Sequence, residues 1–278
     1  MNSKYPIFIP TKGRYKTPFT IKALQAIGVP FKAVVEAQEH DDYAAVVGED
    51  NLIVLPHQNQ GLTVTRNWIW DYAQYELKTP YFWTMDDNIT NFYRLNRNIK
   101  YRVDSGTFLY VMEEFANRYE NLAISGMHYS MFTPANEKSN PYILNTRIYS
   151  NMLIKTDIPF RNVTFYNDDT DLCLRVLKAG YCTCQFCAFL ADKKATMTVK
   201  GGMTDYYEKT EKRRQFAEEL QRAHPDVVRI VWRYNRWHHH VDYRPFKNNR
   251  LIRKPGVEIP EGVNNYGMKL VNLMSDLG

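Results

Sequence analysis

Short apolar runs alternate with segments of helical periodicity through the first part of the chain. Strands are predicted at YPIFIP (5–10), FKAVVEA (31–37), NLIVLP (51–56) and YFWTM (81–85). Helices are predicted at TPFTIKALQAIG (17–28), at 41–47 and at GLTVTRNWIWDYAQYELK (61–78). Strands and helices that alternate at this spacing are typical of βαβ units. The pattern therefore predicts an α/β fold with a mostly parallel sheet covered by helices.

Polar side chains follow three of the predicted strands, at the point where each strand ends. The first strand is followed by Thr11, Lys12, Gly13 and Arg14, the second by Glu36 and the fourth by Asp86, Asp87 and Asn88. Open α/β sheets bind their ligands at the carboxyl ends of their strands, so we expect these groups to meet in one crevice. The oxygens of the last cluster suit a hard cation, or a ligand that carries one. An ordinary turn at PTKGR and a helix cap at the acidic cluster are the structural alternatives.

A second acidic cluster begins a predicted helix at NDDTDLCLRVLKAGY (167–181). Asp168, Asp169 and Asp171 lie in its first turn, and Gly180 ends it. The helix dipole favours carboxylates there, which makes capping an alternative, but three aspartates exceed what a cap needs. A carboxylate in a crevice near a metal can act as a general base. Arg66, near the start of an earlier helix, can contact a phosphate, or form a surface salt bridge.

The composition is that of a globular protein. The chain has 278 residues, of which 44% are hydrophobic and 24% charged, which fits one large domain or one domain with an appendage. It has no signal peptide pattern and no run of about 18 apolar residues, so we expect a cytoplasmic protein without a membrane partner. The four cysteines fall between positions 173 and 187, which favours reduced thiols; a zinc site at Cys182, Cys184 and Cys187 lacks a second ligand pair.

The positive charge is concentrated near the C-terminus. Residues 229–254 contain eight basic residues and one acid, Asp242, whereas the whole chain has a net charge of +6. Tryptophan, tyrosine and histidine are interleaved with these charges. A nucleic acid would engage both, because phosphates attract the cations and bases stack on the rings. A solvated rim around a small anion site is the alternative. The candidate contacts are Arg233, Arg236, Trp237, His238, Arg244, Lys247 and Arg250.

The ordered motifs together resemble a known family. IPTKGR, VVEAQE, GLTVTRN, MDDN and NDDTDLCLRVLKAG are similar to those of GT-A nucleotide-sugar glycosyltransferases of the family 2 type, over roughly residues 5 to 190. More narrowly, PTKGR, WTMDDNI, KGGMTDYY and RWHHHVDYRPFKNNRL resemble the TET-associated glycosyltransferases of bacteriophages, over nearly the whole chain. The resemblance implies a Rossmann-like GT-A catalytic domain at 1–200. Residues 201–278 would form a helical, basic and aromatic extension packed on that domain and contacting DNA.

The resemblance also implies an activity. The protein would transfer a sugar from a UDP-sugar to 5-hydroxymethylcytosine in phage DNA, in the host cytoplasm, with inversion at the sugar carbon. Asp86, Asp87 and Asn88 match the motif that holds Mn²⁺ or Mg²⁺; many members have a third aspartate where Asn88 stands. The positions that hold the nucleoside are matched by Thr11, Arg14 and Glu36, and Lys12, next to Thr11, is a further contact for the nucleotide-sugar. Arg66 matches the arginine that faces the diphosphate or ribose. Asp169 matches the catalytic base, and Asp168 replaces the usual glutamate beside it.

Two further segments have open interpretations. Lys200, Gly201 and Gly202 form a glycine-containing loop that would approach a phosphate, or a plain surface turn. One of three consecutive histidines, with His239 as the central one, would complete the metal shell or contact a phosphate. The helix at about 205–223 is interpreted as a solvated amphipathic element.

Three other functions share part of these features. A transferase for a glycan or lipid acceptor would use the same carboxylates and ignore DNA at physiological salt. A nucleotidyltransferase would also use paired carboxylates and a metal, but it would attach the nucleotide instead of releasing it. A non-catalytic DNA-binding protein would need the basic segment alone.

Overall fold

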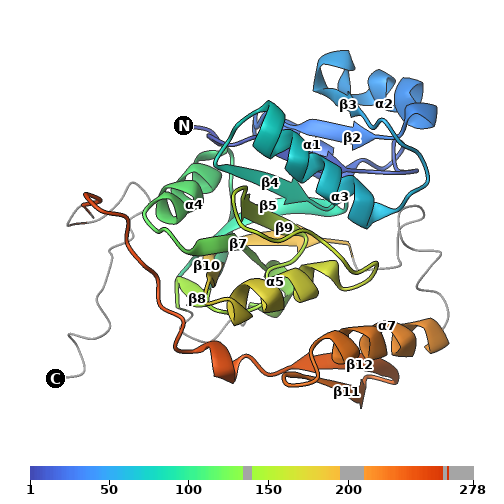
Figure 1. Cartoon of the computed structure of the whole chain (residues 1–278). Coiled ribbons are helices and arrows are strands. Elements are labelled where there is room, and N and C mark those ends of the chain that lie inside the picture. The colour runs from blue at the N-terminus through green and yellow to red at the C-terminus, as the bar shows by residue number, and fades with distance from the viewer. Residues whose placement is uncertain (134–139, 195–209, 259–261, 263–278) are drawn as a thin grey trace.

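The computed structural model describes residues 1–133, 140–194, 210–258 and 262 (Figure 1). The strands are β1 (Ile7–Pro10), β2 (Lys32–Val35), β3 (Leu52–Val54), β4 (Tyr81–Met85), β5 (Ile89–Asn96), β6 (Ile99–Arg102), β7 (Leu122–Tyr129), β8 (Tyr142–Leu144), β9 (Asn151–Lys155), β10 (Cys182–Lys193), β11 (Val228–Arg233) and β12 (Arg236–Val241). The α-helices are α1 (Phe19–Ala26), α2 (His40–Val47), α3 (Leu62–Asp71), α4 (Thr107–Asn117), α5 (Asp168–Lys178) and α7 (Thr210–Ala223). Residues Tyr72–Glu76 continue α3 as a π-helix, and 3₁₀ turns span Ala37–Glu39, Glu49–Asn51, Ser130–Phe132 and Arg244–Phe246.

Ten of the described strands form one central sheet. Their order is β3-β2-β1-β4-β9-β7-β10-β5-β6, with β8 paired to β10. Seven strands run in one direction, and β9, β5 and β8 run in the other. The predicted α/β fold with a mostly parallel, helix-covered sheet is confirmed. The four strands predicted in the first 85 residues are parallel neighbours, and the antiparallel strands all come later in the chain.

The sheet is covered on both faces because successive strand residues point to opposite sides. Along β1, Ile7 and Ile9 pack in a cluster with α1, α2 and α4, whereas Phe8 packs in a cluster with α3 and α5. Along β4, Tyr81, Trp83 and Met85 join the first cluster, and Phe82 joins the second. The structure therefore has three layers, with the sheet in the middle. Because β1, β2 and β4 are buried in this layer, their positions fix where the polar residues that follow them reach the surface.

The segment after residue 209 packs on α5 through a smaller apolar cluster. Leu174 and Leu177 of α5 contact Leu220 of α7, Val228 of β11 and Phe246. Asn249 donates hydrogen bonds to the carbonyl oxygens of Leu177 and Tyr181, at 2.7 and 2.8 Å. In Figure 1, α7 and the hairpin β11–β12 lie next to α5, on the opposite side of the molecule from β2 and β3. No helix among the described residues is long and apolar enough to cross a bilayer.

Candidate active site

The end of β1 and the loop after β4 meet through Asp87. The Thr11 hydroxyl donates to Asp87 Oδ2 at 3.0 Å, and the Arg14 guanidinium forms an ion pair with Asp87 Oδ1. The Tyr43 hydroxyl lies 2.7 Å from Thr11 Oγ1 and accepts a hydrogen bond from the Arg14 backbone N–H at 3.0 Å. Burial and the neighbouring charge of Asp86 raise the pKa of Asp87 in spite of Arg14. Three predicted site residues therefore come together here.

The end of β2 supplies a second polar group to the same edge. Glu36 is buried, and it accepts hydrogen bonds from Lys12 Nζ at 2.7 Å and from the Asn59 backbone at 3.0 Å. Lys12 Nζ also reaches the Asn59 side-chain oxygen at 2.6 Å. Burial raises the pKa of Glu36, but hydrogen bonds from Lys12, Gln38 and Asn59 outweigh it, so the pKa lies below its ordinary value. Glu36 is thus an ionised acceptor beside a cation.

Arg66, on the second turn of α3, connects the two acidic clusters. Its guanidinium donates to Asp86 Oδ1 at 3.0 Å and forms an ion pair with Asp168 Oδ2. Burial, together with the charges of Asp169 and Asp86, raises the pKa of Asp168, although Arg66 opposes the shift. The nearby carboxylates in turn raise the pKa of Arg66 against its burial. One arginine thus joins β4 to the start of α5.

Asp86 also contacts two residues that the sequence did not single out. Ser150, just before β9, donates to Asp86 Oδ2 at 2.6 Å, and Lys193, at the end of β10, lies 3.4 Å from the same oxygen. Lys193 also donates to Ser150 Oγ at 2.8 Å. Burial raises the pKa of Asp86, but the charges of Lys193 and Arg66 outweigh it and lower the pKa below its usual value. Asp86 is therefore an anion at neutral pH.

Asp169 is the one partly exposed carboxylate in the first turn of α5. Its Oδ1 accepts from the backbone N–H and the hydroxyl of Thr170, at 2.6 and 3.1 Å. Among the residues that the structure describes, none donates a hydrogen bond to its Oδ2. One oxygen of Asp169 is therefore held by its own helix, and the other is available to a substrate.

Arg147 lies between Asp169 and the hairpin. Its guanidinium stacks 4.1 Å from the Tyr149 ring centroid and donates to His239 Nε2 at 3.3 Å. Burial would lower the pKa of Arg147, but the charge of Asp169 and the Tyr149 contact raise it. Burial and the Arg147 charge lower the pKa of His239 to about 4, so its imidazole is neutral at physiological pH. His239, which was predicted as a metal ligand or phosphate contact, thus faces a cation of the chain.

The predicted DNA contacts lie on the hairpin and the loop that follows it. Arg233, Arg236, Trp237 and His238 belong to β11 and β12, whereas Arg244, Lys247 and Arg250 follow them. Arg244 is neutralised by Asp242, with its Nη2 at 2.7 Å from Oδ2. The Arg250 carbonyl accepts from Asn121 at 2.9 Å, which fastens this loop to the central domain. Lys200, Gly201 and Gly202 lie outside the described residues.

A divalent cation has a partial set of ligands in this site. Asp86 is ionised and partly exposed, although its two oxygens accept from Arg66 and Ser150, and Asn88 Oδ1 is a buried amide oxygen without a hydrogen-bond partner among the described residues. The carboxylate of Asp87 is already taken by Arg14 and Thr11. Within the described ranges, no group of three or more His, Cys, Asp or Glu side chains is placed to hold a metal. All four cysteines are buried and free. The chemistry of Asp86 and Asn88 fits a hard cation whose remaining ligands come from a bound substrate.

Sequence reasoning missed four site residues: Arg147, Tyr149, Ser150 and Lys193. Lys193 ends a long apolar strand, so the strand-end rule that found Asp86 could have found it. The other three lie in the segment that precedes β9, where a short polar stretch enters a buried strand. Nothing in that stretch indicates by itself that an antiparallel strand would bring it next to Asp86.

The chain is similar to one protein family. A family model described as TET-Associated Glycosyltransferase matches residues 5–202, a range that contains every residue of the two acidic clusters. No curated protein matches the chain. Among solved structures, the chain is similar to the crystal structure of mannose-6-phosphate isomerase from Helicobacter pylori, with 10% identity, a TM-score of 0.28, and coverage of 91% of this chain and 94% of that chain. A TM-score this low carries no argument about fold or function.

Proposed function

The chain belongs to the TET-associated glycosyltransferase family, and on that premise we propose that it transfers a sugar from a UDP-sugar to 5-hydroxymethylcytosine in phage DNA. The family name indicates a glycosyltransferase and points to modified DNA as the acceptor. The donor and the mechanism proposed below rest on the site residues, and the acceptor base rests on the resemblance of the sequence motifs to those of the bacteriophage enzymes. The observation that supports the donor and the mechanism is the pairing of Arg66 with both Asp86 and Asp168, because one cation, which would face the diphosphate, joins the carboxylates of both motifs.

The donor nucleotide would bind along the ends of β1, β2 and β4. The nucleoside would be held by Thr11, Arg14 and Glu36, which line this edge. Lys12 would exchange its ion pair with Glu36 for a contact with a phosphate. Arg66 and Lys193 both face Asp86, so their charges are close enough to a bound diphosphate there to stabilise it. The prediction that Lys200, beside Gly201 and Gly202, contacts a phosphate concerns residues outside the described ranges and stays a prediction.

A Mn²⁺ or Mg²⁺ ion is part of the proposal. Asp86 and Asn88 would hold it, with Asp87 and His239 as further ligands if they were released from Arg14 and Arg147. When bound, the ion neutralises charge on the departing UDP. Chelation followed by Mn²⁺ or Mg²⁺ addition tests this part, and full transfer in the presence of a chelator would refute it.

Asp169 would act as the base. Its Oδ2, to which none of the described residues donates, would accept the proton of the hydroxymethyl group while the oxygen of that group attacks the anomeric carbon. The new carbon–oxygen bond forms as the bond from the sugar to UDP breaks, and the electron pair of that bond leaves with the diphosphate. A single in-line displacement of this kind inverts the anomeric centre.

The test is to incubate the protein with Mn²⁺, a panel of UDP-sugars and duplex DNA that contains either cytosine or 5-hydroxymethylcytosine. Digestion to nucleosides and mass spectrometry would then report any added sugar. We expect a hexose or N-acetylhexosamine increment on 5-hydroxymethylcytosine alone. UDP release without a DNA product would refute the DNA acceptor and favour a glycan or lipid acceptor. A nucleotide attached to the product would instead indicate a nucleotidyltransferase.

A further inference from the structure

The hairpin β11–β12 turns through Tyr234 and Asn235, which both have positive φ, at 53° and 55°. A two-residue hairpin turn of this kind favours asparagine and glycine, because they tolerate left-handed backbone at little cost. An aromatic residue with positive φ is uncommon, and such outliers persist where the structure or the function demands them. Tyr234 therefore occupies a position that turn chemistry alone would not give it.

Packing does not account for Tyr234 either. Its side chain is 87% exposed, and the nearest ring, that of His238, has its centroid 6.2 Å away. Trp232 on the adjacent strand is 52% exposed and meets Trp237 edge to face at 5.0 Å. Large rings gathered at one exposed end of an element are typical of a contact surface.

The charges beside the turn indicate which partner the tip fits. Arg233 and Arg236 lie directly opposite each other on β11 and β12, where like charges destabilise a strand pair. Of the acidic side chains in the described ranges, none forms a salt bridge with either arginine, whereas Arg244 in the next loop is paired with Asp242. Two cations that lack an acidic partner among the described residues stand on either side of an exposed ring, with Arg236 also donating to His238 at 3.0 Å, and they suit a partner with regularly spaced negative charges and flat faces.

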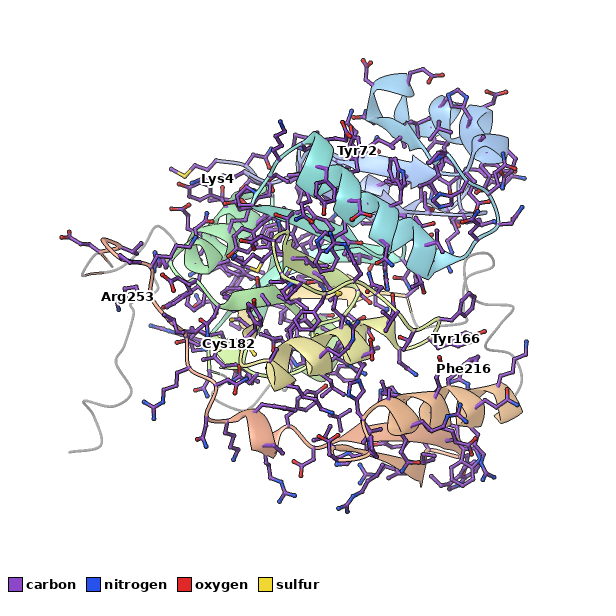
Figure 2. The ribbon with its side chains drawn as sticks, viewed as in Figure 1. Lys4, Tyr72, Tyr166, Cys182, Phe216 and Arg253 are labelled. Carbon is purple, nitrogen blue, oxygen red and sulfur yellow. The ribbon has the colours of Figure 1, made fainter. Side chains whose placement is uncertain are left out.

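The base of the hairpin is fixed to the candidate active site, whereas its tip extends away from it. Val228 and Val241 join the apolar cluster on α5, and His239 accepts from Arg147. Figure 2 labels Tyr166 and Phe216, which stack at 3.3 Å between centroids and hold α7 against the segment before Asp168. Three strand residues, Arg236 to His238, separate the turn from His239, and the four steps from Asn235 to His239 give a reach of about 13 Å at the usual strand rise. The tip thus stands at a set distance from the reacting groups.

We propose that the tip of this hairpin is a wedge for duplex DNA. Tyr234 enters the base stack at the position that the acceptor base leaves, and Arg233 and Arg236 bind the phosphates on either side. An extruded base leaves a gap in the duplex, and an inserted ring lowers the cost of opening it. This inference rests on the proposed function, since it assigns to the tip the task of presenting the acceptor base.

The test compares transfer to three substrates of one sequence: a duplex with 5-hydroxymethylcytosine opposite guanine, the same modified strand alone, and a duplex with that base opposite an abasic site. Tyr234→Asn is the informative variant because asparagine suits the turn, so the fold should be at least as stable. We expect transfer to the paired duplex to fall about ten- to a hundredfold, in line with the loss of one stacking contact. Transfer to the other two substrates should stay within about twofold, because neither requires the ring to open a base pair.

The controls separate this inference from the proposed function. Tyr75→Ala removes another exposed tyrosine, on the π-helix that continues α3, and should leave all three rates unchanged. Tyr234→Phe should retain transfer to the duplex. The wedge would be overturned if Tyr234→Asn lost transfer equally on the duplex and the single strand, or if its rate on the duplex were unchanged. It would also be overturned if this variant lost binding to anionic lipid vesicles while its transfer stayed normal. If the wild-type protein modifies none of the substrates, the proposed function itself fails.

Discussion

Replacing Arg66 by methionine should destabilise the protein because it removes the charge that two carboxylates share. Arg66 and Asp168 have side-chain exposures of only 10% and 11%, so their ion pair is largely screened from water. Asp86 would keep Ser150 and Lys193 as partners, at 2.6 and 3.4 Å. The uncompensated group would therefore be Asp168, with Asp169 adding to the repulsion.

The size of the effect follows from that difference. Removing one partner of a buried ion pair costs about 3–5 kcal/mol, and the remaining contacts of Asp86 place this variant near the lower end, at about 3 kcal/mol. For a chain of this size, each kcal/mol lowers the melting temperature by roughly 2–4 °C. We therefore expect a fall of about 6–12 °C near neutral pH.

The loss should depend on pH. The pKa of Asp168 is already raised in the folded protein, and without Arg66 it rises further. An acid with a raised folded pKa favours the folded state while it is protonated, and that contribution is lost as pH rises from about 4 through the folded pKa. The difference between variant and wild type should therefore be smaller at pH 5 than at pH 8.

Chemical denaturation followed by tryptophan fluorescence at both pH values measures this, since Trp70 and Trp83 are fully buried. The matched control is the double variant Arg66→Met with Asp168→Asn, which removes the uncompensated charge and should recover most of the lost stability. An equal deficit at pH 5 and pH 8 would refute the reasoning, as would a double variant no more stable than the single one.

Three further outcomes are expected. Asp169→Asn should retain UDP-sugar binding in calorimetry and lose transfer; lost binding would make it a donor or metal residue. Asp171→Asn should reduce stability by about 1–3 kcal/mol at pH 7, because it weakens the hydrogen bond of 2.9 Å to the buried His224. His224 and Arg175 lower the pKa of Asp171 against its burial, so the stability lost by Asp171→Asn should shrink as pH falls below about 4. A loss of stability that stays constant in acid denaturation would contradict this. Gly126→Ala should lower the melting temperature, because a Cβ there would lie 2.1 Å from the Asn151 carbonyl oxygen; an unchanged value would contradict the close approach.

The parallel half of the fold could be predicted because its strands are continuous apolar runs bounded by turns. YFWTM coincides with β4, and GLTVTRNWIWDYAQYELK contains α3 and the π-turn that follows it. Parallel strands end at the same edge, so the strand-end rule brought Thr11 and Glu36 to one side of the sheet with Asp86 and Asp87. The contact of Thr11 with Asp87 agrees with that expectation.

The antiparallel strands could not be predicted because a short apolar run does not encode its direction. β9 enters the sheet between β4 and β7 in the reverse sense, and this reversal brings Ser150, at the start of β9, next to Asp86 at the end of β4. Arg147 occupies the same entering segment and was missed for the same reason. From the sequence, the charged residues of the predicted site were expected to bind a ligand. In the structure, most of them form ion pairs with one another.

Arg66 and Arg147 place the neighbouring aspartates Asp168 and Asp169, which the sequence left close to equivalent, in different surroundings. Asp168 is buried and its carboxylate is bound to Arg66, so it holds that arginine in place. Asp169 keeps one oxygen to which none of the described residues donates, and it has Arg147 beside it, on the side of the hairpin. A base must present a free oxygen to the acceptor, which favours Asp169 over Asp168. Because Arg147 also donates to His239, the arginine beside Asp169 is joined directly to the hairpin.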